Sequence, residues 1–215
     1  MSVIGDPQLE HLLDGLHARS DGQVAALERF ERDKATQSEL KAFLSDKLVA
    51  LDRDKAEFCY LLCRAINARR IVEIGTSFGI STLYLAAAVR DNVRASGGAG
   101  VVIGTEYEPA KANAARAHFE QAGLSGFIDL REGDLRDTLS AIEGPVDFML
   151  VDIWIRMARP ALELVTPHLR RGAIVICDNT ARFRADYADY FASLESNGFR
   201  TMTLPFDGGL EFSIR

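Results

Sequence analysis

The sequence predicts an α/β fold: a doubly wound, seven-stranded, mostly parallel sheet with a C-terminal antiparallel hairpin and an N-terminal helical segment. From Arg70 onward, short apolar runs alternate with segments of helical periodicity, as expected for parallel strands with helices on both faces. A glycine-containing turn follows the first apolar run, which is typical of nucleotide-binding α/β folds. The chain closes with two β runs around Asp207-Gly208-Gly209, and a hairpin there makes the sheet mixed.

Residues 6–68 show helical periodicity and few apolar runs long enough for a strand. The last predicted helix has an apolar face that includes Phe58 and Leu62, and Asp54 is placed to cap its N-terminus. We expect residues 1–54 to form a helical cap or dimerisation segment and residues 55–215 to form one domain. The predicted helices are Gln8–Arg19, Gly22–Lys34, Gln37–Leu51 and Lys55–Ala68.

The rest of the chain divides into alternating strands and helices. The stretch Arg94–Gly100, RASGGAG, is glycine-rich and is expected to be a flexible loop between the first helix and the second strand. The predicted strands are residues 71–75, 101–106, 127–131, 146–152, 173–178, 199–204 and 210–214. The predicted helices are residues 80–90, 109–122, 135–142, 156–170 and 184–197.

The composition limits the classes of partner and compartment. A net charge of −6, a pI near 5.3 and the lack of a basic stripe argue against a nucleic-acid partner. No apolar run approaches the roughly 20 residues needed to cross a bilayer, and the N-terminal residues do not resemble a secretory signal, so no membrane partner is expected. The three cysteines, Cys59, Cys63 and Cys177, have no metal-ligand spacing. We expect them to be reduced core thiols in a cytoplasmic protein.

The segment Ile71–Thr82, IVEIGTSFGIST, ends a buried strand in a turn of small residues and continues as a helix. Glycine lets the backbone approach a ligand closely, and Glu106, at the end of the next strand, can accept both hydroxyl protons of a ribose. The spacing Gly75-x-x-x-Gly79 lacks the second glycine that a dinucleotide pyrophosphate requires. Glu73 would repel a pyrophosphate but suits a cationic amino-acid moiety. This charge argument favours S-adenosylmethionine over NAD.

Oxygen-bearing side chains end two neighbouring strands of the predicted sheet. Asp152 ends the strand 146–152, and Asp178 and Asn179 end the strand 173–178. Ligands bind outside the carboxyl ends of such strands, so we expect these groups on one rim beside the cofactor. Two carboxylates and an amide carbonyl suit Mg²⁺ or another hard divalent cation. An alternative stays open, in which Asp152 binds the cofactor's amino group and Asp178-Asn179 is a strand-ending turn.

An ordered series of motifs runs through the chain from about Lys55 to Arg215. In chain order they are VEIGTSFGIST, GTEYEP, REGD, VDFMLVDIW, GAIVICDN and LPFDGGLEFSIR. Together they resemble the small S-adenosylmethionine-dependent O-methyltransferases of the catechol and caffeoyl-CoA O-methyltransferase family, which implies the class I methyltransferase fold. The cofactor-binding residues implied by this resemblance are Glu73, Gly75, Thr76, Ser77, Gly79, Ser81, Glu106, Tyr107, Gly133, Asp134, Leu135, Asp152 and Trp154.

Some of these residues also have purely structural interpretations. Gly133-Asp134 can form an ordinary turn, and Ser81 can satisfy free amides at the start of a helix. Trp154, the only tryptophan, either lines the methyl-transfer pocket or packs between helix and sheet.

The resemblance further implies a metal site of Asp152, Asp178 and Asn179, whose cation would lower the pKa of a bound acceptor hydroxyl. The family's general base, a lysine three residues after the first of these aspartates, is replaced here by Ile155. Isoleucine cannot take a proton. Either the metal suffices, the substrate ionises readily, another group such as Lys55 is the base, or transfer activity has been lost.

We therefore predict an S-adenosylmethionine-dependent O-methyltransferase that methylates a small, catechol-like hydroxyl substrate with the help of a divalent cation. Asp152 and Lys55 are the candidate catalytic residues. One alternative is metal-independent methylation of another small nucleophile, which Ile155 motivates. Another is a non-catalytic S-adenosylmethionine-binding protein that acts through its N-terminal helices, and a dehydrogenase is the most distant. The helical leader predicts a homodimer.

Overall fold

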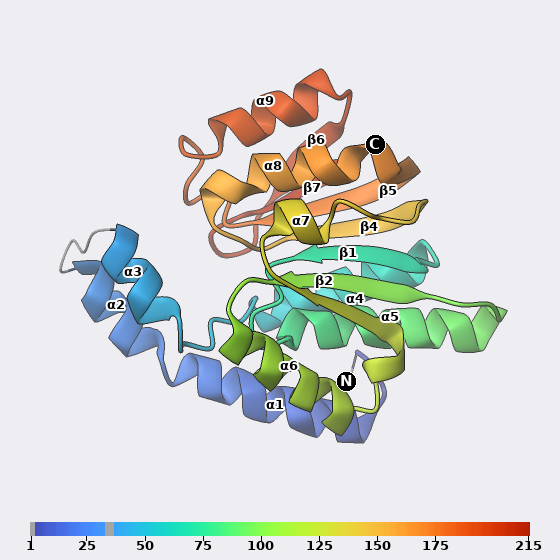
Figure 1. Ribbon diagram of the computed structural model, residues 1–215, viewed down its shortest axis with the longest axis horizontal. Helices are drawn as coiled ribbons and strands as arrows, with labels where there is room; N and C mark the ends of the chain where they lie inside the picture. Colours follow the sequence, from blue (N-terminus) through green and yellow to red (C-terminus); the bar gives the residue numbers. More distant parts are fainter. Residues whose placement is uncertain (1–2, 33–36) are drawn as a thin grey trace.

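The computed structural model describes residues 3–32 and 37–215, and its centre is a seven-stranded sheet of order β3-β2-β1-β4-β5-β7-β6 (Figure 1). Neighbouring strands from β3 to β5 are parallel, and β7 runs antiparallel to both β5 and β6. The predicted fold class, including the C-terminal hairpin, is confirmed. The strands are β1 (Arg70–Ile74), β2 (Val101–Glu106), β3 (Ile128–Glu132), β4 (Val146–Val151), β5 (Leu169–Asp178), β6 (Arg200–Leu204) and β7 (Leu210–Ile214).

Helices cover both faces of the sheet, as parallel strands require. One apolar cluster joins the sheet to α1, α4, α5 and α6, and a second joins the opposite face to α7, α8 and α9 (Figure 1). The helices are α1 (Pro7–Asp21), α2 (Val24–Arg32), α3 (Gln37–Leu44), α4 (Arg53–Ala65), α5 (Ile80–Ser96), α6 (Pro109–Gln121), α7 (Leu135–Thr138), α8 (Ile155–Val165) and α9 (Ala188–Ser196), with short 3₁₀ turns η1 (Ser125–Phe127) and η2 (Thr166–His168).

The strand order reverses between β1 and β4, and this switch point is where open α/β sheets bind ligands. In the register of the sheet, Ile74 lies opposite both Thr105 and Val151, and Val151 lies opposite Cys177. The residues that follow these four positions therefore gather at one rim. The rim contains most of the residues that the sequence marks as functional.

The helix predicted over Gln37–Leu51 is too long. Helix α3 ends at Leu44, and residues 47–52 continue as a loop toward α4. The side chain of Gln23 accepts from the amide of Leu48 (3.2 Å) and donates to its carbonyl (3.1 Å). These tertiary hydrogen bonds satisfy backbone groups that would otherwise need helical partners.

Other boundaries also differ from the prediction. Helix α5 continues to Ser96 and ends where Gly97 adopts a positive φ of 70°, so the glycine-rich loop is shorter than expected. The N-cap of α4 is Asp52 rather than Asp54, and its side chain makes no capping hydrogen bond. Helix α7 is shorter than predicted, β5 begins earlier, and α9 begins later. The end of the predicted helix Gly22–Lys34 lies outside the described residues.

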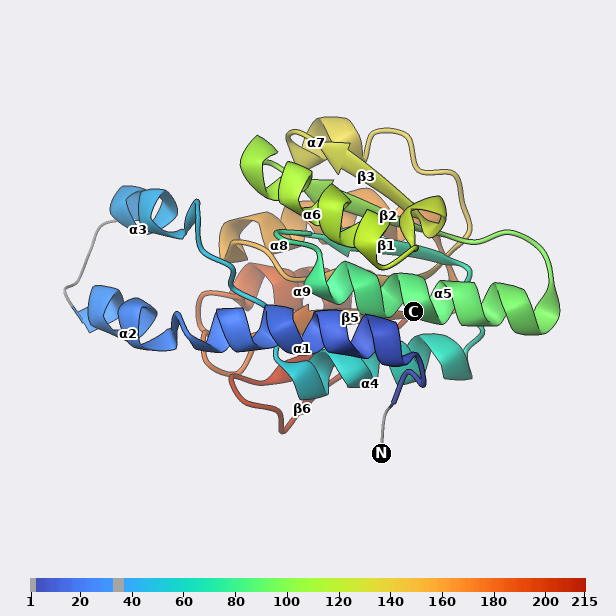
Figure 2. The ribbon, with the colours of Figure 1, turned by 90° about the horizontal axis from the view of Figure 1, so that it is seen from below.

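Helices α2 and α3 form a hairpin that projects from the body of the molecule, while α1 lies alongside α4 and α5 (Figures 1 and 2). Phe30 and Phe43 stack between α2 and α3 with 4.2 Å between ring centroids. Leu9, Leu13 and Leu16 of α1 belong to the same apolar cluster as α4 and α5. The division at residue 54 and the dimerisation role of the leader remain predictions.

The three cysteines are free and buried, as predicted. Among the residues that the structure describes, no helix combines the length and apolarity needed to cross a membrane.

Candidate functional site

The turn between β1 and α5 brings backbone unusually close to the end of β4. Gly75 has a φ of 91°, and a Cβ there would lie 2.0 Å from the carbonyl oxygen of Asp152. The Asp152 amide donates to the Ile74 carbonyl at 3.0 Å. Only glycine fits this position, because a side chain would separate the two strand ends. Ser77 and Gly79 also have positive φ, so the turn is held in a tight, specific conformation.

Glu73 is a fully buried carboxylate just below this turn. Its Oε2 accepts from the hydroxyls of Thr76 (3.0 Å) and Thr82, whereas its Oε1 accepts no hydrogen bond. Burial raises the pKa of Glu73, and the neighbouring hydroxyls, including that of Ser81, only partly offset this. A buried carboxylate oxygen without a partner is costly, so the site is prepared for a cation or donor from a ligand.

Glu106 ends β2 on the other side of the turn and is nearly buried. Its two oxygens accept from the backbone amides of Ser77 (2.7 Å) and Glu108 (2.8 Å). These bonds fix the carboxylate and leave further lone pairs to accept from a diol. Tyr107 follows with a largely exposed side chain.

The residues after β3 bind one another through local hydrogen bonds and an ion pair, which the resemblance did not imply. Gly133 has a φ of 135°, and Asp134 caps α7 by accepting from the Arg136 amide at 2.9 Å. The Arg136 side chain pairs with the same carboxylate and lowers its pKa. Leu135 is buried in the apolar cluster with α8. Asp134 is therefore engaged locally, as in the ordinary-turn interpretation.

Asp152, Asp178 and Asn179 lie on one rim, at the ends of the paired strands β4 and β5. Burial first, and then the charges of Asp178 and Glu73, raise the pKa of Asp152 to about 8. Asn179 has a φ of 60° and donates from Nδ2 to Asp178 Oδ2 at 2.9 Å. Its Oδ1 faces Gly208, where a Cβ would lie 2.6 Å away. The hairpin turn between β6 and β7 thus fixes the amide from behind.

Lys55, at the start of α4, reaches this rim and is only 1 % exposed. Its Nζ lies 2.8 Å from Asp178 Oδ1 and 2.7 Å from Asp52 Oδ2. Burial by itself would lower the pKa of Lys55, but hydrogen bonds to the two carboxylates outweigh it and hold the pKa above its ordinary value. Asp178 is itself buried, and desolvation raises its pKa although the ammonium acts in the opposite direction.

Ile155 and Trp154 occupy the start of α8, beyond Asp152. Trp154 is the N-cap residue of α8 and is 40 % exposed, so it does not pack fully between helix and sheet. Ile155 contacts the apolar cluster under α8. No described basic side chain takes the position of the missing lysine, and Arg156 remains on the exposed side of the helix.

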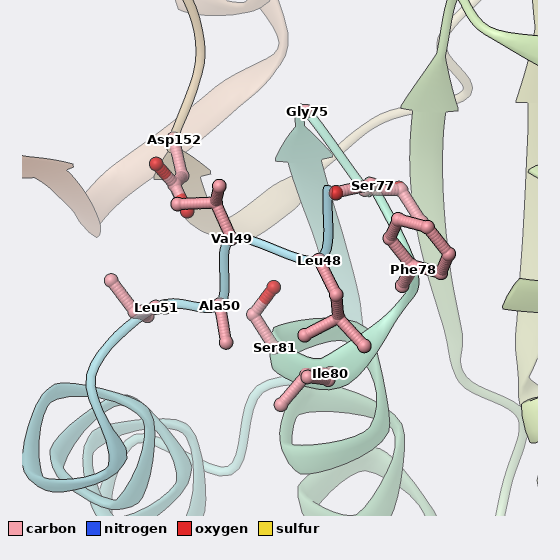
Figure 3. Close-up of a pocket in the computed structure, with 11 residues that line it drawn as sticks. Leu48, Val49, Ala50, Leu51, Gly75, Ser77, Phe78, Ile80, Ser81 and Asp152 are labelled. Atoms are coloured by element: carbon pink, nitrogen blue, oxygen red, sulfur yellow. The ribbon is translucent and has the colours of Figure 1, made fainter. Parts of the chain in front are cut away.

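The loop 48–51 crosses the mouth of the site between Asp152 on one side and Ser77 of the turn and Ser81 of α5 on the other (Figure 3). The space that remains between them is about 10 Å³, close to the ~10–15 Å³ that a single water molecule needs on this measure. On its other side the same loop lines a cavity of about 430 Å³ against α1. The loop therefore separates the rim from a second space and must shift for a ligand to enter between it and Gly75.

Comparison with known proteins places this arrangement in a family. Residues 72–180, about half of the chain, match a family model described as a methyltransferase domain. The chain belongs to this methyltransferase family. The matched segment begins in β1 and ends just after Asn179, so it includes the turn, Glu106 and the rim.

Curated relatives of this methyltransferase are O-methyltransferases. A catechol O-methyltransferase from Mycobacterium tuberculosis is 33% identical over 135 residues, covering 62% of this chain and 58% of the relative. A caffeoyl-CoA O-methyltransferase 2 from Eucalyptus globulus is 26% identical over 164 residues, covering 70% and 62%. The matched segments thus span about three fifths of these relatives. The resemblance to S-adenosylmethionine-dependent O-methyltransferases is confirmed.

Solved structures agree with the methyltransferase fold. The cofactor-bound crystal structure of Rv0187 from MTB is 25% identical, with a TM-score of 0.70 over 97% of this chain and 89% of that one. An O-methyltransferase from Bacillus cereus in complex with SAH is 19% identical, with a TM-score of 0.70 over 98% and 91%, and shows the fold alone.

Sequence reasoning identified most of the residues on the rim of this methyltransferase, but it missed two features. It did not place the loop 48–51 over the site, because the helical pattern continued through it. It also did not find the partners of Lys55, because Asp52 and Asp178 are brought to it only by folding. The one available signal was an acidic and basic cluster, Asp52 to Lys55, immediately before an amphipathic helix.

Proposed function

We propose that this protein transfers the methyl group of S-adenosylmethionine to a hydroxyl of a small aromatic acceptor. The observation that carries this proposal is the pair of carboxylates, Glu73 and Glu106, at the ends of adjacent strands on either side of the Gly75 turn. Glu73 offers a buried, unpartnered oxygen to a cation. Glu106 offers fixed acceptor lone pairs to a diol. An amino acid joined to a ribose supplies both.

The residues of the turn would hold the cofactor in the following way. Glu73 would take the ammonium of the methionine moiety, and Glu106 the ribose hydroxyls. The tight backbone at Gly75 and Ser77 would lie against the part of the cofactor that joins the methionine moiety to the ribose. Tyr107 and the turn Gly133-Asp134-Leu135 would receive the adenine end. Bound S-adenosylmethionine supplies an electrophilic methyl group on a positively charged sulfur.

The acceptor class follows from the relatives. A catechol and a caffeoyl-CoA O-methyltransferase support a hydroxyl on an aromatic ring as the nucleophile. The acceptor would approach the rim from the side of Asp152 and Trp154, where the tryptophan is partly exposed. Holding the acceptor oxygen in line with the methyl group is expected to be the main source of rate enhancement.

The divalent cation predicted at the rim does not fit the side chains as they are arranged. The donor set has the right chemistry, but Asp178 Oδ1 is paired with Lys55 and its Oδ2 with the Asn179 amide. A metal ion on Asp178 would also lie close to a buried ammonium, a repulsion of several kcal/mol at an effective dielectric constant of about 20. This arrangement of charges favours the metal-independent reaction.

Asp152 is then the candidate proton acceptor. Lys55 is disfavoured as a base, because its pKa is raised and the ammonium is held by two carboxylates. The pKa of Asp152 is raised to about 8, near the value that makes a group an effective base at neutral pH. The acceptor hydroxyl would give its proton to Asp152 as its oxygen takes the methyl group and the sulfur becomes neutral.

The test is to incubate the purified chain with S-adenosylmethionine and a panel of catechols, other phenols, alcohols and amines, with and without EDTA. We expect S-adenosylhomocysteine and an O-methylated phenol by mass spectrometry. Glu73→Gln should lose cofactor binding by calorimetry. Tight cofactor binding without product on any acceptor would instead support the non-catalytic alternative, and saturation by NAD alone would overturn the proposal.

A further inference from the structure

The rim of the site carries more negative than positive charge. The charges of Asp178, Glu73 and Asp52 all act on Asp152 and raise its pKa. Among the described residues, Lys55 is the cation that lowers the pKa of Asp152 against these charges. Positive charge near Asp178 and Glu73 stabilises these carboxylates, because buried like charges repel strongly.

Lys55 is held at the rim by burial of its side chain and by two ion pairs. Its side chain is 2 % exposed, and its Nζ contacts Asp178 Oδ1 at 2.8 Å and Asp52 Oδ2 at 2.7 Å. Asp178 lies at the end of β5, whereas Asp52 lies on the loop that covers the site. The ammonium therefore joins the rim to this loop through two ion pairs.

The remaining candidate metal ligands are oriented to match the ammonium. Asn179 turns its amide nitrogen toward Asp178 Oδ2 at 2.9 Å, and its Oδ1 lies against Gly208. Both oxygens of Asp178 are thus already engaged. A divalent cation would need Lys55 to leave and Asn179 to reorient.

We propose that the ammonium of Lys55 takes the place of a divalent metal ion at this rim, fixing Asp178 and the loop 48–52 without any bound cation. Lys55 is a positioning residue in this scheme and does not touch the acceptor. This inference rests on the proposed function, because it treats the rim as part of the methyl-transfer site. Its test measures metal binding and does not require turnover. Removing the ammonium should free Asp178 and convert the rim into a site that binds metal.

The experiment uses Mn²⁺ as the probe, measured by electron paramagnetic resonance and calorimetry on the full chain with S-adenosylhomocysteine. The wild type should show no saturable Mn²⁺ binding into the millimolar range. Lys55→Met keeps the length of the side chain but removes its charge, and should bind Mn²⁺ on the order of 10–100-fold more tightly. Adding Asp178→Asn to this variant should abolish the gain.

Lys47→Met is the matched control, because Lys47 pairs with Asp46 at 2.5 Å outside the rim, and it should bind Mn²⁺ no better than wild type. Stoichiometric Mn²⁺ binding by the wild type that is lost in Asp178→Asn would overturn the inference, even if Lys55→Met fails to fold. So would a folded Lys55→Met variant that gains no Mn²⁺ affinity. Absence of methyl transfer with these metal results intact would count against the proposed function alone.

Discussion

Replacing Gly75 by alanine is expected to damage both stability and cofactor binding, and the structure allows the size of the effect to be worked out. A Cβ at this position would lie 2.0 Å from the backbone oxygen of Asp152, well inside the 3.0 Å that real Cβ contacts respect. The positive φ costs an L-residue about 1–2 kcal/mol. Forcing the backbones of β1 and β4 apart adds about 1–3 kcal/mol. The total is about 2–5 kcal/mol.

The matched control is Gly123→Ala, because Gly123 has a φ of 64° and nothing within 4 Å of its Cβ position. This variant should lose only the backbone part, about 1–2 kcal/mol. Urea unfolding measures both losses, and calorimetry measures the affinity for S-adenosylhomocysteine. We expect Gly75→Ala to be the less stable of the two and the only one that loses cofactor affinity. Equal losses in stability, with wild-type affinity in both variants, would refute the steric reasoning.

Three further predictions concern the same site. Glu106→Gln removes a charged acceptor of ribose hydroxyls and should weaken S-adenosylhomocysteine binding by on the order of 10–100-fold in calorimetry; unchanged affinity would exclude Glu106 from the site. Asp152→Asn should stabilise the ligand-free protein, by an amount that grows from pH 4 to pH 8 and is constant above pH 8. The reason is that the stability of the wild type falls as the pH rises from the ordinary pKa of 3.8 to the folded value of about 8. A stability difference in urea unfolding that does not depend on pH would contradict this. Gln23→Ala should release the loop 48–51 and speed cofactor association in stopped-flow measurements, whereas Gln121→Ala should not; equal rates would show that the loop does not limit entry.

Much of the fold could be predicted because its signals are local. The apolar runs of β1, β2 and β4 are bounded by glycine or charged residues, and each is buried as a strand of a parallel sheet should be. The residue that follows each strand end could also be predicted, because parallel strands present their carboxyl ends at the same rim. That topological rule alone brought Glu106, Asp152 and Asp178 together.

The loop 45–52 could not be predicted in the same way, because its conformation depends on partners distant in sequence. Its residues have ordinary helical propensity, and Leu48 and Leu51 fit an apolar face. In the folded chain the same leucines are buried, but they lie in a non-helical segment. The side chain of Gln23 holds this segment through hydrogen bonds to the backbone of Leu48. Tertiary hydrogen bonds and burial here outweigh a propensity that is worth only a few tenths of a kcal/mol per residue.

The two unusual residues of this site, Ile155 and Lys55, have a common physical consequence. Because α8 begins with isoleucine, the positive charge at the rim is the ammonium of Lys55, which comes from α4 and pairs with Asp178. Among the described residues no cation forms an ion pair with Asp152, and burial with the charges of Asp178 and Glu73 raises its pKa to about 8. With that pKa, Asp152 of the ligand-free protein is mostly protonated at neutral pH, and it releases its proton when a cation binds nearby. Arrival of a sulfonium would therefore favour ionised Asp152, so cofactor binding itself would prepare the proton acceptor for the hydroxyl that follows.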